Sequence, residues 1–267
     1  GHSKAILAQL GSKGRLFAFD QDKDAWRNKP EDERLTAITE NFRHLKRFLR
    51  LHGVAKVDGI LADLGVSSYQ FDTAERGFSI RYDGPLDMRM DYRMELTAAD
   101  ILAKYSEKEL HKLFEQYGEV RNSKQLAQHI VANRNKGGLN SIASLKALIA
   151  PVVKGIEQRY LAQVFQALRI AVNDEFGALK DLLDQSAQCL NPSGRLSIIT
   201  FHSLEDRIVK QFVKNGGKEN EDTGLLGNEK TTWCLKPVFA KPIEPSTEEI
   251  KNNPRARSAK LRIAAHI

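Results

Sequence analysis

An apolar run that ends in an acidic residue constrains the fold more than any other segment of the chain. Residues 57–62 read Val-Asp-Gly-Ile-Leu-Ala, as expected of a buried strand, and Asp63 follows directly. About 25 residues without clear secondary structure come next, and such a loop inside a compact domain is more often functional than accidental. In open α/β sheets, ligands bind just beyond the carboxyl ends of the strands. The sequence therefore predicts a binding site at Asp63 and the loop after it.

Strand-like and helix-like segments alternate on both sides of this run. The predicted strands span residues 15–20, 35–39, 57–63 and 195–200, with two final strands over 231–238 and 259–264 that we expect to pair antiparallel. A predicted helix over residues 4–10 precedes the first of these strands, and a second over 43–51 lies between the second and third. Strands that alternate with helices at this spacing indicate a parallel sheet, so the expected fold class is α/β.

Residues 96–155 differ from the rest of the chain because their periodicity is almost purely helical. We expect an α/β domain in two parts, residues 1–94 and 158–267, around a helical insertion over residues 95–157. One long helix is predicted over 160–190, a capping box over Ser203–Asp206, and a mobile polar loop over 215–230.

The first twenty residues are typical of the start of a nucleotide-binding unit. Gly1 and Ser3 read as the end of a glycine turn that opens a helix, and Asp20 ends the next predicted strand. In such units an acid about 20 residues after the glycine turn binds the ribose hydroxyls. The strand expected before Gly1 is absent from the sequence, so we expect the sheet to lack its first strand.

Polar or aromatic side chains follow four of the predicted strands, at Asp20, Phe42, Asp63 and His202. An ionised carboxylate accepts two hydrogen bonds, so Asp20 suits vicinal hydroxyls, while Phe42 can stack on a purine. The alternatives are an ordinary acid at a strand end for Asp20 and core packing for Phe42. A dinucleotide and S-adenosylmethionine share the adenosine half, and this pattern does not choose between them.

The loop after Asp63 carries further hydrogen-bonding groups. Asp63 would be costly to bury without a partner, and it is suited to accept a hydrogen bond from an amino group. Ser67, Ser68 and Gln70 lie on the same loop, although serines are also common in loops that bind nothing.

Charged residues elsewhere allow both a functional and a structural interpretation. Asp87 and Arg89 alternate with methionines, which fits either a clamp at the cleft or a charged edge segment with core methionines. His202 opens a helix, where a lone histidine is more often structural than catalytic. A basic run near the C-terminus is either a solvated face or a phosphate-binding strip; its members are Arg255, Arg257, Lys260 and Arg262.

Composition narrows the class of partner and compartment. The formal net charge of +7 favours a polyanionic partner. Cys189 and Cys234 lie far apart, and no cysteine or histidine cluster has the spacing of metal ligands, so we predict neither a metal site nor a disulfide framework. No apolar run reaches the length of a membrane span and no signal peptide is visible, so we expect a cytoplasmic protein.

Eight motifs occur in order along the chain. They are Gly1-His2-Ser3, Phe19-Asp20-Gln21-Asp22, Glu40-Asn41-Phe42, Ala62-Asp63-Leu64-Gly65-Val66-Ser67-Ser68 with Gln70-Phe71-Asp72, Gly84-Pro85-Leu86-Asp87-Met88-Arg89-Met90, Phe165-Gln166-Ala167-Leu168-Arg169, Phe201-His202-Ser203-Leu204-Glu205-Asp206-Arg207 and Asn253-Pro254-Arg255-Ala256-Arg257-Ser258. Together the motifs span essentially the whole chain, and the chain resembles the bacterial 16S ribosomal RNA (cytosine-N4)-methyltransferase family.

This resemblance implies a Rossmann-like class I methyltransferase fold with a helical insertion. It implies S-adenosylmethionine as the methyl donor and a cytidine in the decoding region of the small-subunit rRNA as the acceptor. The cofactor contacts carried over by the matching motifs are Gly1, His2, Asp20, Phe42, Asp63 and Gln70.

The residues agree with methylation of an exocyclic amine, which needs no covalent step. It needs acceptors that hold the amino group against the donor, and Asp63, Ser67 and Ser68 are of that kind. Methylation of carbon 5 would need a thiolate, and neither cysteine lies on a predicted strand-end loop.

The substrate-binding residues that we predict are Asp87, Arg89, His202, Arg255 and Arg257. The expected partner is small-subunit rRNA or the assembled small subunit, and no oligomeric state is predicted. Two alternatives remain open: an RNA-binding ribosome assembly factor without turnover, and a nicotinamide-dependent oxidoreductase.

Overall fold

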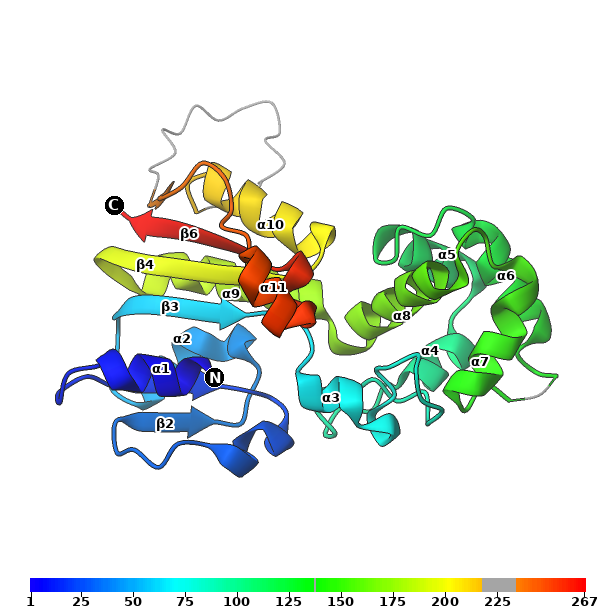
Figure 1. The fold of residues 1–267 in the computed structure, drawn as a ribbon, viewed down its shortest axis with the longest axis horizontal. Coiled ribbons are helices and arrows are strands. Elements are labelled where there is room, and N and C mark those ends of the chain that lie inside the picture. Colours follow the sequence, from blue (N-terminus) through cyan, green and yellow to red (C-terminus); the bar gives the residue numbers. More distant parts are fainter. Residues whose placement is uncertain (137, 218–233) are drawn as a thin grey trace. The chain divides into compact units, whose positions relative to one another are not determined.

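The computed structural model describes residues 1–136, 138–217 and 234–267 (Figure 1). The chain divides into two compact units. The first, here called the sheet unit, combines Gly1–Gly65 with Phe176–Ile267, and the second, the helical unit, is Val66–Glu175. None of the helices in the described ranges is both long and apolar enough to span a membrane.

Two sheets form the centre of the sheet unit. The strands are β1 (Leu16–Phe19), β2 (Leu35–Ile38), β3 (Val57–Asp63), β4 (Leu190–Thr200), β5 (Leu235–Pro237) and β6 (Lys260–His266). β1 and β2 pair in parallel, and the larger sheet has the order β3-β4-β6-β5. β3 and β4 are parallel, whereas β6 runs antiparallel to both β4 and β5. The predicted parallel arrangement and the antiparallel final strands are confirmed.

Helices cover the sheets of this unit. They are α1 (His2–Gln9), α2 (Leu45–Leu51), α9 (Glu175–Cys189), α10 (Ser203–Lys214) and α11 (Thr247–Asn252), with 3-10 turns η1 (Lys23–Asn28), η2 (Phe42–His44) and η5 (Pro254–Ser258). Apolar residues of α2, α9 and α10, among them Leu49, Leu182 and Phe212, pack with Leu196 and Ile198 of β4 in one buried cluster. The α/β fold class with a Rossmann-like sheet is therefore confirmed. In the described part of the chain β1 and β3 are not paired with each other. The expectation that the sheet lacks a first strand stays a prediction.

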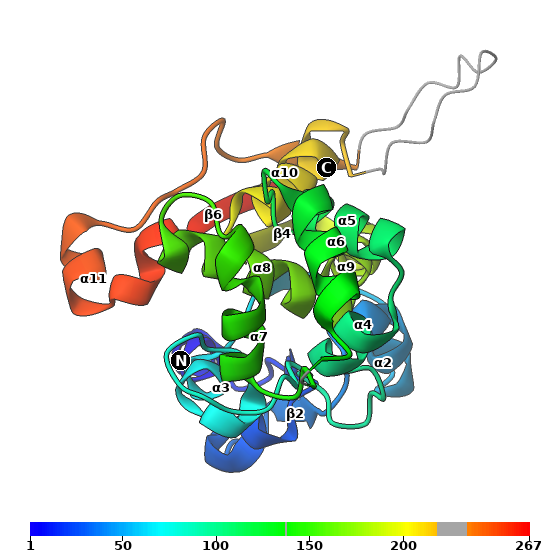
Figure 2. The same ribbon diagram turned by 90° about the vertical axis from the view of Figure 1, so that its right-hand side faces the viewer.

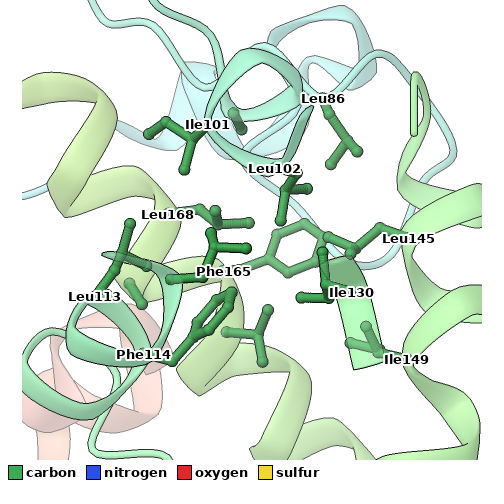
Figure 3. Packing of buried hydrophobic residues seen from close by; sticks show 14 of the residues in the cluster. Leu86, Ile101, Leu102, Leu113, Phe114, Ile130, Leu145, Ile149, Phe165 and Leu168 are labelled. Carbon is green, nitrogen blue, oxygen red and sulfur yellow. The ribbon is translucent and has the colours of Figure 1, made fainter. Parts of the chain in front are cut away.

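The helical unit has a separate core. Its elements are α3 (Ser68–Asp72), η3 (Ala74–Arg76), α4 (Ala98–Lys104), α5 (Glu107–Gln116), α6 (Ser123–Asn133), α7 (Ile142–Ile149), η4 (Ala150–Val152) and α8 (Glu157–Asn173). α8 packs against α4 and α5, and α6 packs against α5 and α7 (Figure 2). Leu102, Phe114, Ile130 and Leu145 from four different helices meet in this core with no exposed surface (Figure 3).

The helical unit extends beyond the predicted insertion over residues 95–157 on both sides. The loop before α4 contributes Phe78, Leu86, Met88 and Met90 to the core of the unit. Helical periodicity begins only at α4, so it does not reveal that the irregular segment before it belongs to the same core.

The predicted long helix over residues 160–190 is wrong, because the structure has two helices there. Asp174 has φ of 46°, in the left-handed region, and ends α8 before α9 begins at Glu175. Aspartate adopts this conformation more readily than most residues. The loop predicted over residues 215–230 lies mostly outside the described residues, as does the start of the strand predicted over 231–238.

Gly77 gives the first testable prediction. It has φ of 75°, and a Cβ there would lie 2.4 Å from the carbonyl oxygen of Pro85. Gly155 has φ of 76° in the same unit but no heavy atom within 4 Å of such a Cβ. Gly155→Ala should lower the free energy of unfolding by about 1–2 kcal/mol through backbone strain. Gly77→Ala should cost about 1–3 kcal/mol more, because the loop must shift. Urea denaturation measures both, and equal costs would contradict this account.

Candidate active site

The carboxyl ends of the strands gather the predicted residues of the sheet unit. β1 and β2 are parallel, and the Asn41 side-chain amide after β2 donates to Gln21 Oε1 after β1 at 2.8 Å. Asp63 is paired with Ile199 near the end of β4, so it lies at the same edge as His202. The arrows of β2 and β3 point the same way in Figure 1, which places both sets of strand ends on one side of the unit.

The first residues of α1 connect these two sets of strand ends. His2 Nδ1 lies 3.4 Å from Asp63 Oδ2. Gly1 and His2 also line a cavity of about 240 Å³, together with Trp26. The indole N–H of Trp26 donates to the backbone carbonyl of Asp20 at 3.2 Å. The start of α1 therefore lies close to Asp63 and to the loop that follows Asp20.

Asp63 has an unusual electrostatic environment for a strand-end acid. Its side chain is 43% exposed. Partial burial nevertheless raises the pKa of the Asp63 carboxyl, and the nearby Glu205 carboxylate raises it further, while His2 opposes both. Asp63 consequently binds a proton more readily than an ordinary aspartate does.

Asp20 is held in a fixed turn. Its Oδ1 accepts a hydrogen bond from the backbone N–H of Asp22 at 2.9 Å. The buried Asp22 carboxylate in turn accepts from the N–H of Asp24 and caps η1. These contacts fix the loop after β1, and the role of Asp20 as a ribose ligand stays a prediction.

Phe42 is half-buried and packs against the apolar core of the sheet unit. This contact supports the core-packing alternative. Its Asn41 neighbour caps η2 by accepting from the N–H of Arg43 at 3.0 Å. A stacking role for Phe42 therefore remains a prediction, and core packing is the alternative role.

The start of α10 is organised by Glu205, which the sequence analysis did not place in the site. The predicted capping box began at Ser203, whereas the N-cap residue is His202 and its capping partner is Glu205. Glu205 is 2% exposed, and its Oε2 accepts from the N–H of Phe201 at 2.9 Å. His202 Nδ1 accepts from the N–H of Glu205 at 3.4 Å, so the predicted substrate role of His202 competes with a capping role. The glutamate three residues after His202 is the sequence signal that indicates this capping box.

A buried ion pair ties α10 to β6. Asp206 accepts two hydrogen bonds from the Arg262 guanidinium, at 2.7 Å from Nε and 3.0 Å from Nη2. Arg262 therefore does not belong to the basic strip that the sequence shows around it. Arg255 and Arg257 are exposed on η5, and their predicted contacts with RNA remain predictions.

The predicted residues of the loop after Asp63 belong to the helical unit. Ser67 Oγ accepts from the N–H of Gln70 at 3.2 Å, and Gln70 Oε1 accepts from the N–H of Ser67 at 3.0 Å. This capping box opens α3, with Ser68 exposed and Gln70 buried. Their roles toward cofactor and substrate stay predictions.

Asp87 and Arg89 bind each other. Arg89 Nε and Nη2 each donate to the Asp87 carboxylate at 2.8 Å, and Nη1 donates to the Met94 carbonyl at 2.7 Å. Hydrogen bonding to the Asp87 carboxylate raises the pKa of Arg89. Met88 and Met90 are buried beside the pair. The contacts favour the charged edge segment with core methionines over a clamp.

Both cysteines lie away from the strand ends that carry Asp63. Cys189 precedes Leu190, which pairs with Val57 at the opposite end of β3, and burial raises the pKa of its thiol. Cys234 precedes Leu235, which pairs with His266 at the far end of β6. Neither is placed to act as a nucleophile next to Asp63. Within the described ranges no group of histidine, cysteine or acidic residues has the arrangement of a metal site.

Comparison with known proteins identifies the family. The sequence profile of the MraW methylase family matches residues 1–267. The chain belongs to the MraW methylase family. It is 51% identical to a Flavobacterium psychrophilum protein over 266 residues, which cover 99% of this chain and 90% of the relative. A Cytophaga hutchinsonii relative is 54% identical over 268 residues, covering 99% and 89% of the two chains. Both are named ribosomal RNA small subunit methyltransferase H. The chain is therefore a class I methyltransferase, as its motifs predict.

Proposed function

We propose that this member of the MraW methylase family methylates the exocyclic N4 of a cytidine in the decoding region of small-subunit rRNA, with S-adenosylmethionine as the donor. The names of its relatives support rRNA of the small subunit as the substrate. The observation that carries the proposal is Asp63, a half-exposed carboxylate with a raised pKa beside the cavity lined by Gly1 and His2.

The donor set of the sheet unit fits the proposed cofactor. Asp20 would accept from the ribose hydroxyls, and Gly1 and His2 would face the rest of the molecule from the wall of the cavity. When bound, S-adenosylmethionine supplies an electrophilic methyl group. Phe42 and Gln70 remain further proposed contacts.

Besides its proposed contact with the cofactor, Asp63 has two tasks toward the substrate. Its carboxylate would accept a hydrogen bond from the amino group and hold N4 in the orientation for attack. N4 exchanges one hydrogen, lost as a proton, for the methyl group, and the raised pKa of Asp63 suits it to receive that proton. Ser67 and Ser68 are proposed to add hydrogen bonds to the base, which must leave its stack to reach them.

The direction of the pKa shift predicts how the rate depends on pH. Only the ionised Asp63 carboxylate accepts the amine hydrogen bond without donating one. Methyl transfer should therefore fall as the pH drops through the pKa of Asp63, which is raised above the ordinary aspartate value. The measurement is kcat against pH with saturating donor and RNA. A rate that stays constant down to the ordinary aspartate pKa would contradict this role.

Mass spectrometry of small-subunit rRNA nucleosides tests the proposed function. A strain that lacks the gene should lose N4-methylcytidine from the decoding region and regain it when the gene is restored. Loss of a different methylated nucleoside would contradict the N4 assignment. RNA binding without methyl transfer by the purified protein would favour the assembly-factor alternative. Cytoplasmic location and the assembled subunit as substrate belong to the same proposal.

A further inference from the structure

A short basic and apolar segment lies along the outer edge of the larger sheet. Residues 236–243, here called the edge platform, comprise the last two residues of β5 and the six that follow it, and they read Lys-Pro-Val-Phe-Ala-Lys-Pro-Ile. Three of its apolar side chains are unusually exposed: Val238 at 41%, Phe239 at 52% and Ile243 at 45%. Clustered exposed apolar side chains usually mark an interaction site.

The backbone of the edge platform is held in place on both sides of Phe239. The N–H of Val238 donates to the Ile263 carbonyl at 2.9 Å. Ile243 and Leu261 exchange two backbone hydrogen bonds, each of 2.9 Å. Phe239 is therefore presented by an anchored stretch of chain, which lowers the conformational entropy lost on binding.

The composition of the edge platform favours one kind of partner. Pro237 and Pro242 lack the N–H that an added strand would need, which disfavours pairing with a peptide strand. Lys236 and Lys241 are exposed on either side of Phe239, and the segment contains no acidic residue. An exposed aromatic ring between cations is how proteins bind single-stranded nucleic acid, by stacking a base and attracting the adjoining phosphates.

Strand register relates the edge platform to Asp63. Ile243 is bridged to Leu261, Leu261 pairs with Ile199, and Ile199 pairs with Asp63, all in one row across the sheet. Three strand-to-strand steps place the backbone of Ile243 about 14 Å from that of Asp63. A single strand a few nucleotides long can span this separation.

We propose that the edge platform binds a single-stranded part of the RNA substrate that flanks the methylated base. One base stacks on Phe239, and the adjoining phosphates lie near Lys236 and Lys241. The inference rests on the proposed function for the identity of the substrate, but the binding itself does not require methyl transfer.

Fluorescence anisotropy with a labelled single-stranded oligocytidine RNA tests the edge platform. Phe239→Ala should raise Kd roughly tenfold, the loss expected for one base–aromatic stack, and Phe239→Trp should restore affinity. Lys241→Gln should reduce the slope of log K against log salt by about 0.7. The matched control is Leu51→Ala in α2, a 67% exposed apolar residue away from the platform, which should bind as the wild type does.

Two outcomes would contradict the proposal that the edge platform binds RNA. One is a Phe239→Ala variant with unchanged RNA affinity and an unchanged salt slope for Lys241→Gln. The other is a Phe239→Ala variant that binds RNA normally but no longer binds assembled small subunits, which would show that the edge platform binds a ribosomal protein. Phe239-dependent RNA binding without any methyl transfer would support the platform while contradicting the proposed function, so the two failures are distinguishable.

Discussion

Asp63→Asn is expected to lower methyl transfer at saturating donor by on the order of 10²-fold or more, with RNA affinity unchanged within about twofold. The amide keeps the size of the side chain but cannot take up the amine proton. Single-turnover transfer of a labelled methyl group to small-subunit rRNA measures the rate, and anisotropy measures RNA affinity.

Asp58→Asn is the matched control. Asp58 lies on the same strand, near its other end, and accepts from the Asn191 side chain at 2.7 Å. The Asp58→Asn variant should methylate at the wild-type rate. If Asp63→Asn lost RNA affinity and methyl transfer to the same extent, Asp63 would be a binding residue and not the acceptor for the amine.

The same substitution also has a predicted effect on stability. Because the pKa of Asp63 is raised in the folded state, that state holds the Asp63 proton more tightly than the unfolded chain does. The free energy of unfolding is therefore reduced as the pH rises from the ordinary aspartate pKa through the raised one. Asp63→Asn should remove this loss and not lower the thermal midpoint at neutral pH. A lower midpoint would contradict this.

Asp206→Ala is expected to lower the free energy of unfolding of the sheet unit by about 3–5 kcal/mol. Asp206 is 9% exposed and bidentate to Arg262, so its removal leaves a guanidinium whose side chain is only 13% exposed without its carboxylate. Urea denaturation measures the free energy of unfolding, and hydrogen exchange of the β4 and β6 amides shows whether the loss arises next to the ion pair.

Asp181→Ala is the control for that substitution. Asp181 pairs with Arg43 at 2.6 Å in the same unit, but the two side chains are 48% and 28% exposed. Removing a largely exposed pair should cost no more than about 1 kcal/mol. Equal costs for the two substitutions would show that burial of the Asp206–Arg262 pair does not determine its contribution.

Local patterns predicted what local interactions determine. The apolar run before Asp63 forms β3, and the alternation of strands and helices gives the parallel pairs β1–β2 and β3–β4. The position of Asp63 at a strand end follows from its place in the run, and family motifs added the methyltransferase class.

Contacts between distant residues account for what the sequence analysis missed. Arg262 belongs to a basic run that the sequence assigns to a solvated face or a phosphate-binding strip, but it pairs with Asp206, 56 residues away. The buried Met88 lies in an irregular loop whose backbone is fixed by Asn173, 85 residues away, so no periodicity marks it as core. The N-cap of α10 is His202, where serine, threonine, aspartate or asparagine is more common, so the usual capping pattern does not indicate the role of Glu205.

Calorimetric titration with S-adenosylmethionine tests the central claim most directly, namely that the strand ends carrying Asp20 and Asp63 form one cofactor site. The account predicts saturable binding by the wild type, with roughly tenfold weaker binding for Asp20→Asn and for Asp63→Asn, because each loses a charge-assisted hydrogen bond. Binding by both variants with wild-type affinity, or no binding by the wild type at millimolar ligand, would contradict it.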